Sequence, residues 1–193
     1  MKEALFNDIL TKPINYTTSK WVLERIPFIF NDDLDLYINW KERLSKLIGV
    51  DSRAIVITGS SSVGYSLNPV KNFKQFSATS DIDVAIISDH YFDIAWHFLR
   101  NIGTKYHRLK QKEKNAIDDH RTRLIYYGTI ATDKIVHLLP FGTIWLEAMV
   151  EMMTVEPTLD KSINFRIYKD FESLKSYQNI SVGLAKDQLL MQQ

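Results

Sequence analysis

The chain of 193 residues contains no cysteine, and this absence removes several classes of functional site. Disulfide scaffolds, thiolate zinc sites and cysteine nucleophiles are excluded, and the composition fits a reducing compartment. The sequence also lacks an apolar run that approaches the roughly 18 residues of a membrane helix. Its first residues do not have the pattern of a secretory signal. We therefore expect a cytoplasmic protein with no membrane partner.

An excess of charge of one sign is also missing, because 24 Lys and Arg stand against 23 Asp and Glu. Net charge alone therefore predicts no polyanionic partner. Hydrophobic residues make up 45% of the chain, which is enough for one globular domain with a closed core. This single domain is expected over residues 1–193, with an N-terminal helical extension (1–50), a core that carries the site (51–140) and C-terminal helices with one late strand (141–193).

Helix and strand patterns alternate along the chain, which predicts an α/β (α+β) layered domain. Residues 1–33 are expected to be irregular. The run Asn31-Asp32-Asp33 offers caps for a helix over residues 34–48, and Gly49 suits its end. The other predicted elements are strands over residues 54–58, 81–87 and 162–168, and helices over about 92–102, from Thr143 to before Pro157, and from Asp170 to about Leu190. The apolar stretch 124–139 is not divided between helix and strand.

Two aspartates stand two residues apart in the strand that begins Asp81-Ile82-Asp83. Because side chains alternate along a strand, Asp81 and Asp83 project from the same face. Carboxylates this close repel each other unless a cation lies between them, and an all-oxygen pair suits Mg²⁺. The alternative is a strand end whose acids cap a helix or face water, because the pattern is short and common.

A Gly-Ser turn follows the preceding strand. Gly59 allows a sharp turn and a close approach of the backbone to a ligand, while Ser60 and Ser61 can donate hydrogen bonds to phosphate oxygens. Backbone N–H groups at the start of a following helix would add to an anion site. A P-loop is excluded because Tyr65 takes the position of its lysine. A plain tight turn is the alternative.

The connection between the turn and the aspartate strand is cationic. Residues 52–80 contain no Asp or Glu, whereas Arg53, Lys71 and Lys74 are present. Such a segment beside the turn favours a phosphate-rich ligand. The alternative is a solvated loop that happens to contain lysines.

Together, G-S-S-S-V-G-Y followed by S-D-I-D-V resembles the motif pair of the DNA polymerase β-like nucleotidyltransferase superfamily, over about residues 50–90. The resemblance implies a small mixed β-sheet flanked by helices. It implies that Asp81 and Asp83 bind Mg²⁺ (or Mn²⁺) and that Gly59 and Ser60 hold the phosphates of a nucleoside triphosphate. An acceptor hydroxyl would then attack the α-phosphorus, and pyrophosphate would leave. The further nucleotide-binding candidates are Ser61, Tyr65, Lys71 and Lys74.

The third carboxylate of that superfamily has no obvious counterpart, because no second Asp-x-Asp strand follows Asp83. Asp133 is the best positional candidate for a catalytic metal ligand, since an apolar run follows it; a turn acid is the alternative. The acceptor could be RNA or tRNA, a protein or a nucleotide, and a basic run over residues 100–123 could guide RNA or simply be a solvated helix face. Without a third acid, the chain would be a nucleotide-binding module that acts as a sensor or partner subunit. The small size resembles stand-alone bacterial nucleotidyltransferases of toxin–antitoxin and phage-defence systems.

Overall fold

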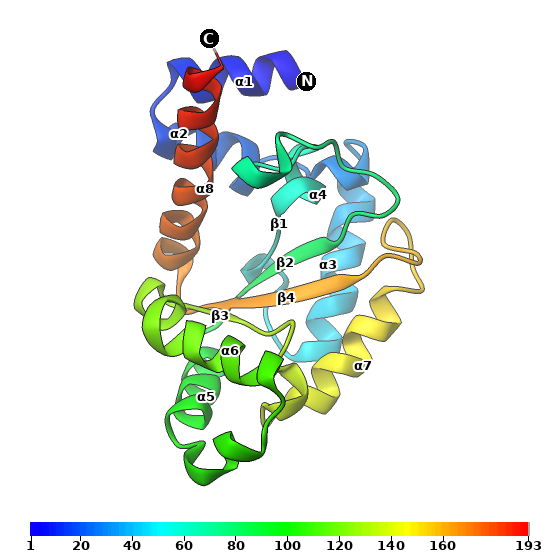
Figure 1. Ribbon diagram of the computed structural model, residues 1–193. Coiled ribbons are helices and arrows are strands. Elements are labelled where there is room, and N and C mark those ends of the chain that lie inside the picture. Colours follow the sequence, from blue (N-terminus) through cyan, green and yellow to red (C-terminus); the bar gives the residue numbers. More distant parts are fainter. Residues whose placement is uncertain (193) are drawn as a thin grey trace.

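The computed structural model describes residues 1–192 and contains one four-stranded sheet with helices on both faces (Figure 1). The helices are α1 (Lys2–Thr11), α2 (Ile14–Thr18), α3 (Leu34–Ile48), α4 (Gly59–Val63), α5 (Asp89–Arg100), α6 (Gln111–Asp119), α7 (Gly142–Met152) and α8 (Phe171–Met191). The strands are β1 (Ile55–Thr58), β2 (Ile82–Ile87), β3 (Thr129–Ala131) and β4 (Ile163–Tyr168). The mixed α/β class expected from the sequence is therefore confirmed.

The sheet has the strand order β1-β2-β4-β3 and mixes both directions of pairing. Strand β2 pairs antiparallel with β1 and parallel with β4, and β3 pairs antiparallel with β4. The predicted strands at 54–58, 81–87 and 162–168 correspond to β1, β2 and β4. Strand β3 lies in the apolar stretch that the sequence pattern left undivided, where only three residues pair with β4.

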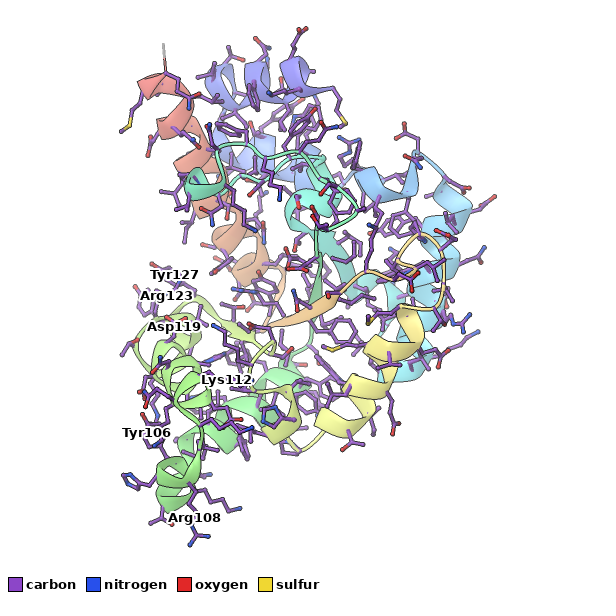
Figure 2. The ribbon with its side chains drawn as sticks, turned by 45° about the vertical axis from the view of Figure 1, so that its right-hand side comes forward. Tyr106, Arg108, Lys112, Asp119, Arg123 and Tyr127 are labelled. Atoms are coloured by element: carbon purple, nitrogen blue, oxygen red, sulfur yellow. The ribbon has the colours of Figure 1, made fainter. Side chains whose placement is uncertain are left out.

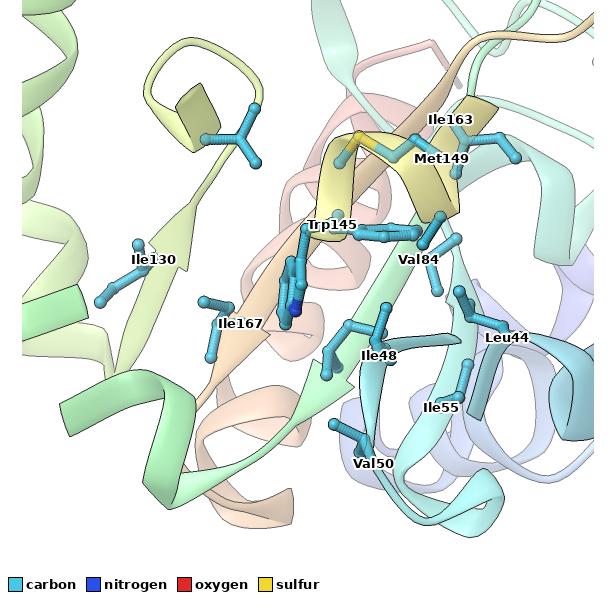
Figure 3. Packing of buried hydrophobic residues seen from close by; sticks show 14 of the residues in the cluster. Leu44, Ile48, Val50, Ile55, Val84, Ile130, Trp145, Met149, Ile163 and Ile167 are labelled. Atoms are coloured by element: carbon cyan, nitrogen blue, oxygen red, sulfur yellow. The ribbon is translucent and has the colours of Figure 1, made fainter. Parts of the chain in front are cut away.

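One face of the sheet is apolar and carries the main core (Figure 3). Helices α3, α5 and α7 contribute buried residues to this core, and Trp145 of α7 is fully buried at its centre. The alternation predicted for the aspartate strand is confirmed, because Ile82, Val84 and Ile86 all point into it. The labelled core side chains in Figure 3 are Leu44, Ile48, Val50, Ile55, Val84, Ile130, Trp145, Met149, Ile163 and Ile167.

The opposite face is polar near one end of the strands and apolar near the other. The strand register places Thr58, Asp83 and Asn164 side by side, and Arg166 lies two residues further along β4. Helix α8 packs over the apolar end, where Leu174 joins a small buried cluster with Val56, Ala85, Ile87 and Tyr168. The polar end of this face lies beneath the middle of α8, whose residues Tyr177, Gln178 and Ser181 line the space above it.

The expectation that residues 1–33 are irregular is wrong, because α1, α2 and two shorter helical turns (Ser19–Leu23 and Phe28–Phe30) occupy most of this segment. Leu5 and Ile9 of α1 are buried in a second core, which α8 completes with Val182, Ala185 and Leu189. Pro13 does not interrupt a helix but stands at the N-cap of α2. The two ends of the chain meet as a result, as the blue and red helices in Figure 1 show.

Three of the four predicted helix caps are confirmed. The Asp33 carboxylate accepts a hydrogen bond from the Leu36 N–H at 2.8 Å, and Gly49 ends α3 in the left-handed region at φ 68°. Asp170 caps α8 in the same way. Thr143 does not cap α7, because that helix already begins at Gly142 without a side-chain cap. Across residues 1–192 no helix combines the length and apolarity needed to cross a membrane.

Candidate functional site

A cavity of about 450 Å³ opens over the polar end of the sheet, between the strand ends and α8. It draws residues from segments that are far apart in the sequence, because strands β1, β2 and β4 and helix α8 all border it. Its polar and charged lining includes Thr58, Gly59, Ser60, Ser66, Asn68, Lys71, Asp83, Asp133, Asn164, Arg166, Tyr177, Gln178 and Ser181.

Gly59 is the point where the Gly-Ser turn meets the carboxylate strand. Its backbone has φ +66°, a conformation that side chains with a Cβ rarely adopt. A Cβ built on Gly59 would come within 2.5 Å of Asp83 Oδ2. The carboxylate therefore lies directly against the turn, and only glycine leaves room for it. Ser60 follows in the first turn of α4 and also lines the cavity.

The side chain of Asp83 is exposed toward the cavity, but the protein atoms around its carboxylate partly bury it from water. This burial raises its pKa, Arg166 acts in the opposite direction, and Asp81 raises the pKa further. Asp81 lies just before β2, is exposed and is not among the residues that line the cavity. The two carboxylates thus interact electrostatically, as the sequence pattern predicts.

Two cations border the same cavity. Lys71 ends the 3₁₀ turn Pro69–Lys71, and its charge lowers the pKa of Asp83. Arg166 lies on β4, next to Ala85 of β2 and Ala131 of β3. Its guanidinium group stands 4.9 Å from the centre of the Tyr177 ring. Nη1 of Arg166 is buried and makes no hydrogen bond to any residue in 1–192.

Asp133 lines the cavity, but it stands in the turn after β3 rather than on a strand. Its charge raises the pKa of Asp83, so the two carboxylates interact electrostatically. Within residues 1–192, however, no three His, Cys, Asp or Glu side chains gather closely enough to form a metal site by themselves. The role of Asp133 as a third metal ligand stays a prediction.

Three of the nucleotide-binding candidates are not part of the cavity lining. Ser61 is fully buried, and its hydroxyl donates to the Thr58 carbonyl at 2.9 Å. Tyr65 is half-buried and its ring is approached by the Lys2 ammonium at 5.6 Å. Lys74 is exposed, while its backbone closes the 66–74 loop through a hydrogen bond from Ser66.

Other lining residues were not singled out from the sequence. Asn164 alternates with the buried residues of β4, so the strand pattern itself marks it as a site-face residue once the pairing with β2 is known. Tyr177, Gln178 and Ser181 come from α8, which lies almost a hundred residues beyond Asp83. No local signal in a helix sequence indicates which of its polar residues will face a distant strand.

Comparisons of the chain with protein-family models, with curated proteins and with solved structures find no match. The G-S-S-S-V-G-Y and S-D-I-D-V motifs therefore stand as a resemblance carried by these residues alone. What the geometry adds is that both motifs border one cavity, together with two cations and a further carboxylate.

Proposed function

We propose that this protein is a metal-dependent nucleotidyltransferase, which binds a nucleoside triphosphate in the cavity and transfers the nucleoside monophosphate to a hydroxyl group. The observation that carries the proposal is the contact between Gly59 and Asp83, where a Cβ would lie 2.5 Å from the carboxylate. This contact supports the proposal because it brings the Gly-Ser turn and the Asp83 carboxylate side by side, as the resemblance to the DNA polymerase β-like superfamily implies.

The phosphates would lie between the Gly-Ser turn and the two cations. The backbone N–H groups of Gly59 and Ser60 are at the start of α4, where N–H groups have no partner within the helix. Lys71 and Arg166 would neutralise the negative charge of the phosphates from the other sides. The buried Nη1 of Arg166 can also donate a hydrogen bond, because it has no acceptor among residues 1–192. A triphosphate would supply the acceptor oxygens that this buried donor otherwise lacks.

The donor chemistry of Asp81 and Asp83 fits Mg²⁺ or Mn²⁺. Mg²⁺ is commonly bound by one or two carboxylates, and substrate phosphates and waters supply its other ligands. The absence of a three-residue cluster within residues 1–192 does not conflict with such a site. When bound, the metal would stabilise negative charge on the phosphate oxygens. The protein's own share would be to hold the triphosphate against the turn and to leave the α-phosphorus open to the acceptor.

The test is release of pyrophosphate from each of the four nucleoside triphosphates with Mg²⁺ and a panel of hydroxyl acceptors. We expect turnover in the wild type and its loss in Asp81→Asn and Asp83→Asn, which remove charge and keep shape. Glu147→Gln is the matched control, because Glu147 is an exposed acid on α7 and is not part of the cavity lining. Equal turnover in Asp83→Asn and the wild type would contradict the proposal.

A second function, a nucleotide-binding module without turnover, is favoured by one observation. The site face of β4, beside Asp83, carries Asn164 and Arg166 instead of an acid, and Asp133 stands in a turn. Such a module would act as a sensor or partner subunit. Tight binding of a Mg²⁺–nucleotide complex with no pyrophosphate from any acceptor would select this function. If the wild type does release pyrophosphate, Asp133→Asn tests the third ligand, because turnover should fall only if the enzyme uses Asp133.

A further inference from the structure

Residues 103–127 form a protruding segment, here called the basic lobe, that contains α6 and three short helical turns: Gly103–Arg108, His120–Leu124 and Ile125–Tyr127. Figure 2 shows it along one edge of the molecule, from Tyr127 and Arg123 at one end to Arg108 at the other. The lobe contains seven Lys and Arg but only three acids. The overall balance of the chain hides this local excess of positive charge.

All three acids of the basic lobe already have partners. Glu113 is buried, accepts a hydrogen bond from the Lys110 N–H and contacts His137 Nε2 at 3.0 Å. Asp118 accepts a hydrogen bond from the Tyr106 hydroxyl, and Asp119 pairs with Arg123 at 2.9 Å. The exposed cations Lys105, Arg108 and Lys112 form no ion pair with any residue in 1–192. Their charge is therefore available to a ligand.

A series of tyrosines connects this lobe to the cavity. Tyr177 lines the cavity, and its ring centre lies 6.4 Å from that of Tyr127. Tyr127 in turn lies 5.3 Å from Tyr126, whose side chain is 87% exposed. Tyr127 is 36% exposed and Tyr177 is half-buried, so the three neighbouring rings lead from solvent to the cavity.

We propose that the basic lobe and the tyrosine series bind a single-stranded polynucleotide, whose terminal hydroxyl enters the cavity as the acceptor. This inference rests on the proposed nucleotidyl transfer and names its acceptor class. Free cations track the phosphates, and exposed rings stack with bases, which are the two elements of single-strand binding. A duplex keeps its bases stacked on one another and would leave Tyr126 without a partner, so the rings favour a single strand.

The transfer step is balanced without a further reactant. The oxygen of the terminal hydroxyl forms a bond to the α-phosphorus of the triphosphate. The bond from the α-phosphorus to its bridging oxygen breaks, and pyrophosphate leaves with the electron pair. The hydroxyl proton passes to solvent. The polynucleotide becomes longer by one nucleotide, so the product can be separated from the substrate by size.

Binding is tested by fluorescence anisotropy with labelled oligonucleotides of about 12 nucleotides, within the range that single-strand sites cover. Single-stranded RNA, single-stranded DNA and a duplex are compared on the full chain. We expect single strands to bind more tightly than the duplex and their affinity to fall as salt rises, because binding releases counterions. Comparison of the affinities for single-stranded RNA and single-stranded DNA shows whether the site prefers ribose or deoxyribose. Equal or tighter binding of the duplex would overturn the proposal.

Two variants test the contacts, each with a matched control. Tyr126→Ala removes an exposed ring on which a base can stack and should weaken single-strand binding by about tenfold, or about 1.4 kcal/mol. Tyr16→Ala removes another exposed tyrosine, on α2, and should leave it unchanged. Lys112→Ala should lower the slope of log affinity against log salt by about 1, whereas Lys46→Ala on α3 should not. Equal effects of Tyr126→Ala and Tyr16→Ala would refute the tyrosine path.

The failure of this inference and the failure of the proposed function give different results. Binding of a Mg²⁺–nucleotide complex and pyrophosphate release are measured in the wild type without an oligonucleotide or with small hydroxyl acceptors. If these hold and no single strand binds, the acceptor assignment alone is wrong. If a single strand binds but no nucleotide does, the nucleotidyltransferase proposal is wrong. Elongation of the labelled strand by the wild type supports both.

Discussion

Replacing Gly59 by alanine probes the contact on which the site depends. The substitution has two separate physical effects. It introduces a Cβ at φ +66°, in the left-handed region, and it places that Cβ 2.5 Å from Asp83 Oδ2, far inside van der Waals contact. The first effect destabilises the fold, whereas the second must displace either the turn or the carboxylate. Gly49→Ala is the matched control, because Gly49 has φ +68° and its Cβ would come no closer than 3.8 Å to the Tyr91 hydroxyl.

The loss of stability that Gly59→Ala and Gly49→Ala have in common comes from the backbone, because both glycines have a positive φ. A side chain in the left-handed region costs about 1–2 kcal/mol. For a chain of this size, each kcal/mol lowers the melting temperature by about 2–4 °C. Gly49→Ala should therefore melt a few degrees below the wild type. Gly59→Ala should lose at least as much, and any additional loss measures how firmly the surrounding residues hold Asp83 in place.

Only Gly59→Ala should change ligand binding. Titration calorimetry with ATP and GTP in the presence of Mg²⁺ measures the affinity of all three proteins. We expect Gly59→Ala to bind at least about tenfold more weakly, a loss of about 1.4 kcal/mol, because both the turn and the metal-binding acid are disturbed. Gly49→Ala should bind as the wild type does. The reasoning is refuted if Gly59→Ala keeps wild-type affinity, or if Gly49→Ala loses as much.

Three further changes test the fold around the site. Trp145→Ala removes a fully buried ring from the main core and should cost about 3–5 kcal/mol in urea unfolding; a loss below about 1 kcal/mol would contradict the packing. Asp170→Ala removes the N-cap that accepts the Ser173 N–H at 2.7 Å and should cost about 1 kcal/mol. Burial lowers the pKa of His120, whose Nε2 accepts the Ala131 N–H at 3.0 Å. The unfolded chain takes up this proton below about pH 6.5 while the native state resists it, so the unfolding free energy should fall as pH drops from about 7 to 5. His120→Gln should flatten that dependence, and an unchanged slope would show that other groups cause it.

The parts of the fold that were predictable have local causes. Asp33 and Gly49 mark the ends of α3 by capping chemistry that depends on a few neighbouring residues. The alternation in Asp81–Ile87 predicted correctly which side of β2 is buried. The Gly-Ser turn was predicted to begin a helix, and α4 begins at Gly59. In each case the residues that give the signal lie within or directly beside the element that they predict.

The parts that were not predictable depend on residues distant in the sequence. Helix α1 was missed because it is short, with 10 residues, and because α8, at the other end of the chain, buries its Leu5 and Ile9. Strand β3 has three residues and is defined by its pairing with β4. That pairing also decides where Asp133 lies, so the local sequence could suggest a position near Asp83 but could not fix it. The contribution of Tyr177 to the cavity has the same cause, since it depends on how α8 crosses the sheet.

The most direct test of the central claim is a crystal structure with Mn²⁺ and a non-hydrolysable nucleoside triphosphate, in which anomalous scattering locates the metal. We expect an anomalous peak bound by Asp81 and Asp83, with the phosphates against Gly59 and Ser60 and within reach of Arg166. A nucleotide bound in the cavity without metal at these aspartates would contradict it, and so would a nucleotide ordered at any other place on the protein.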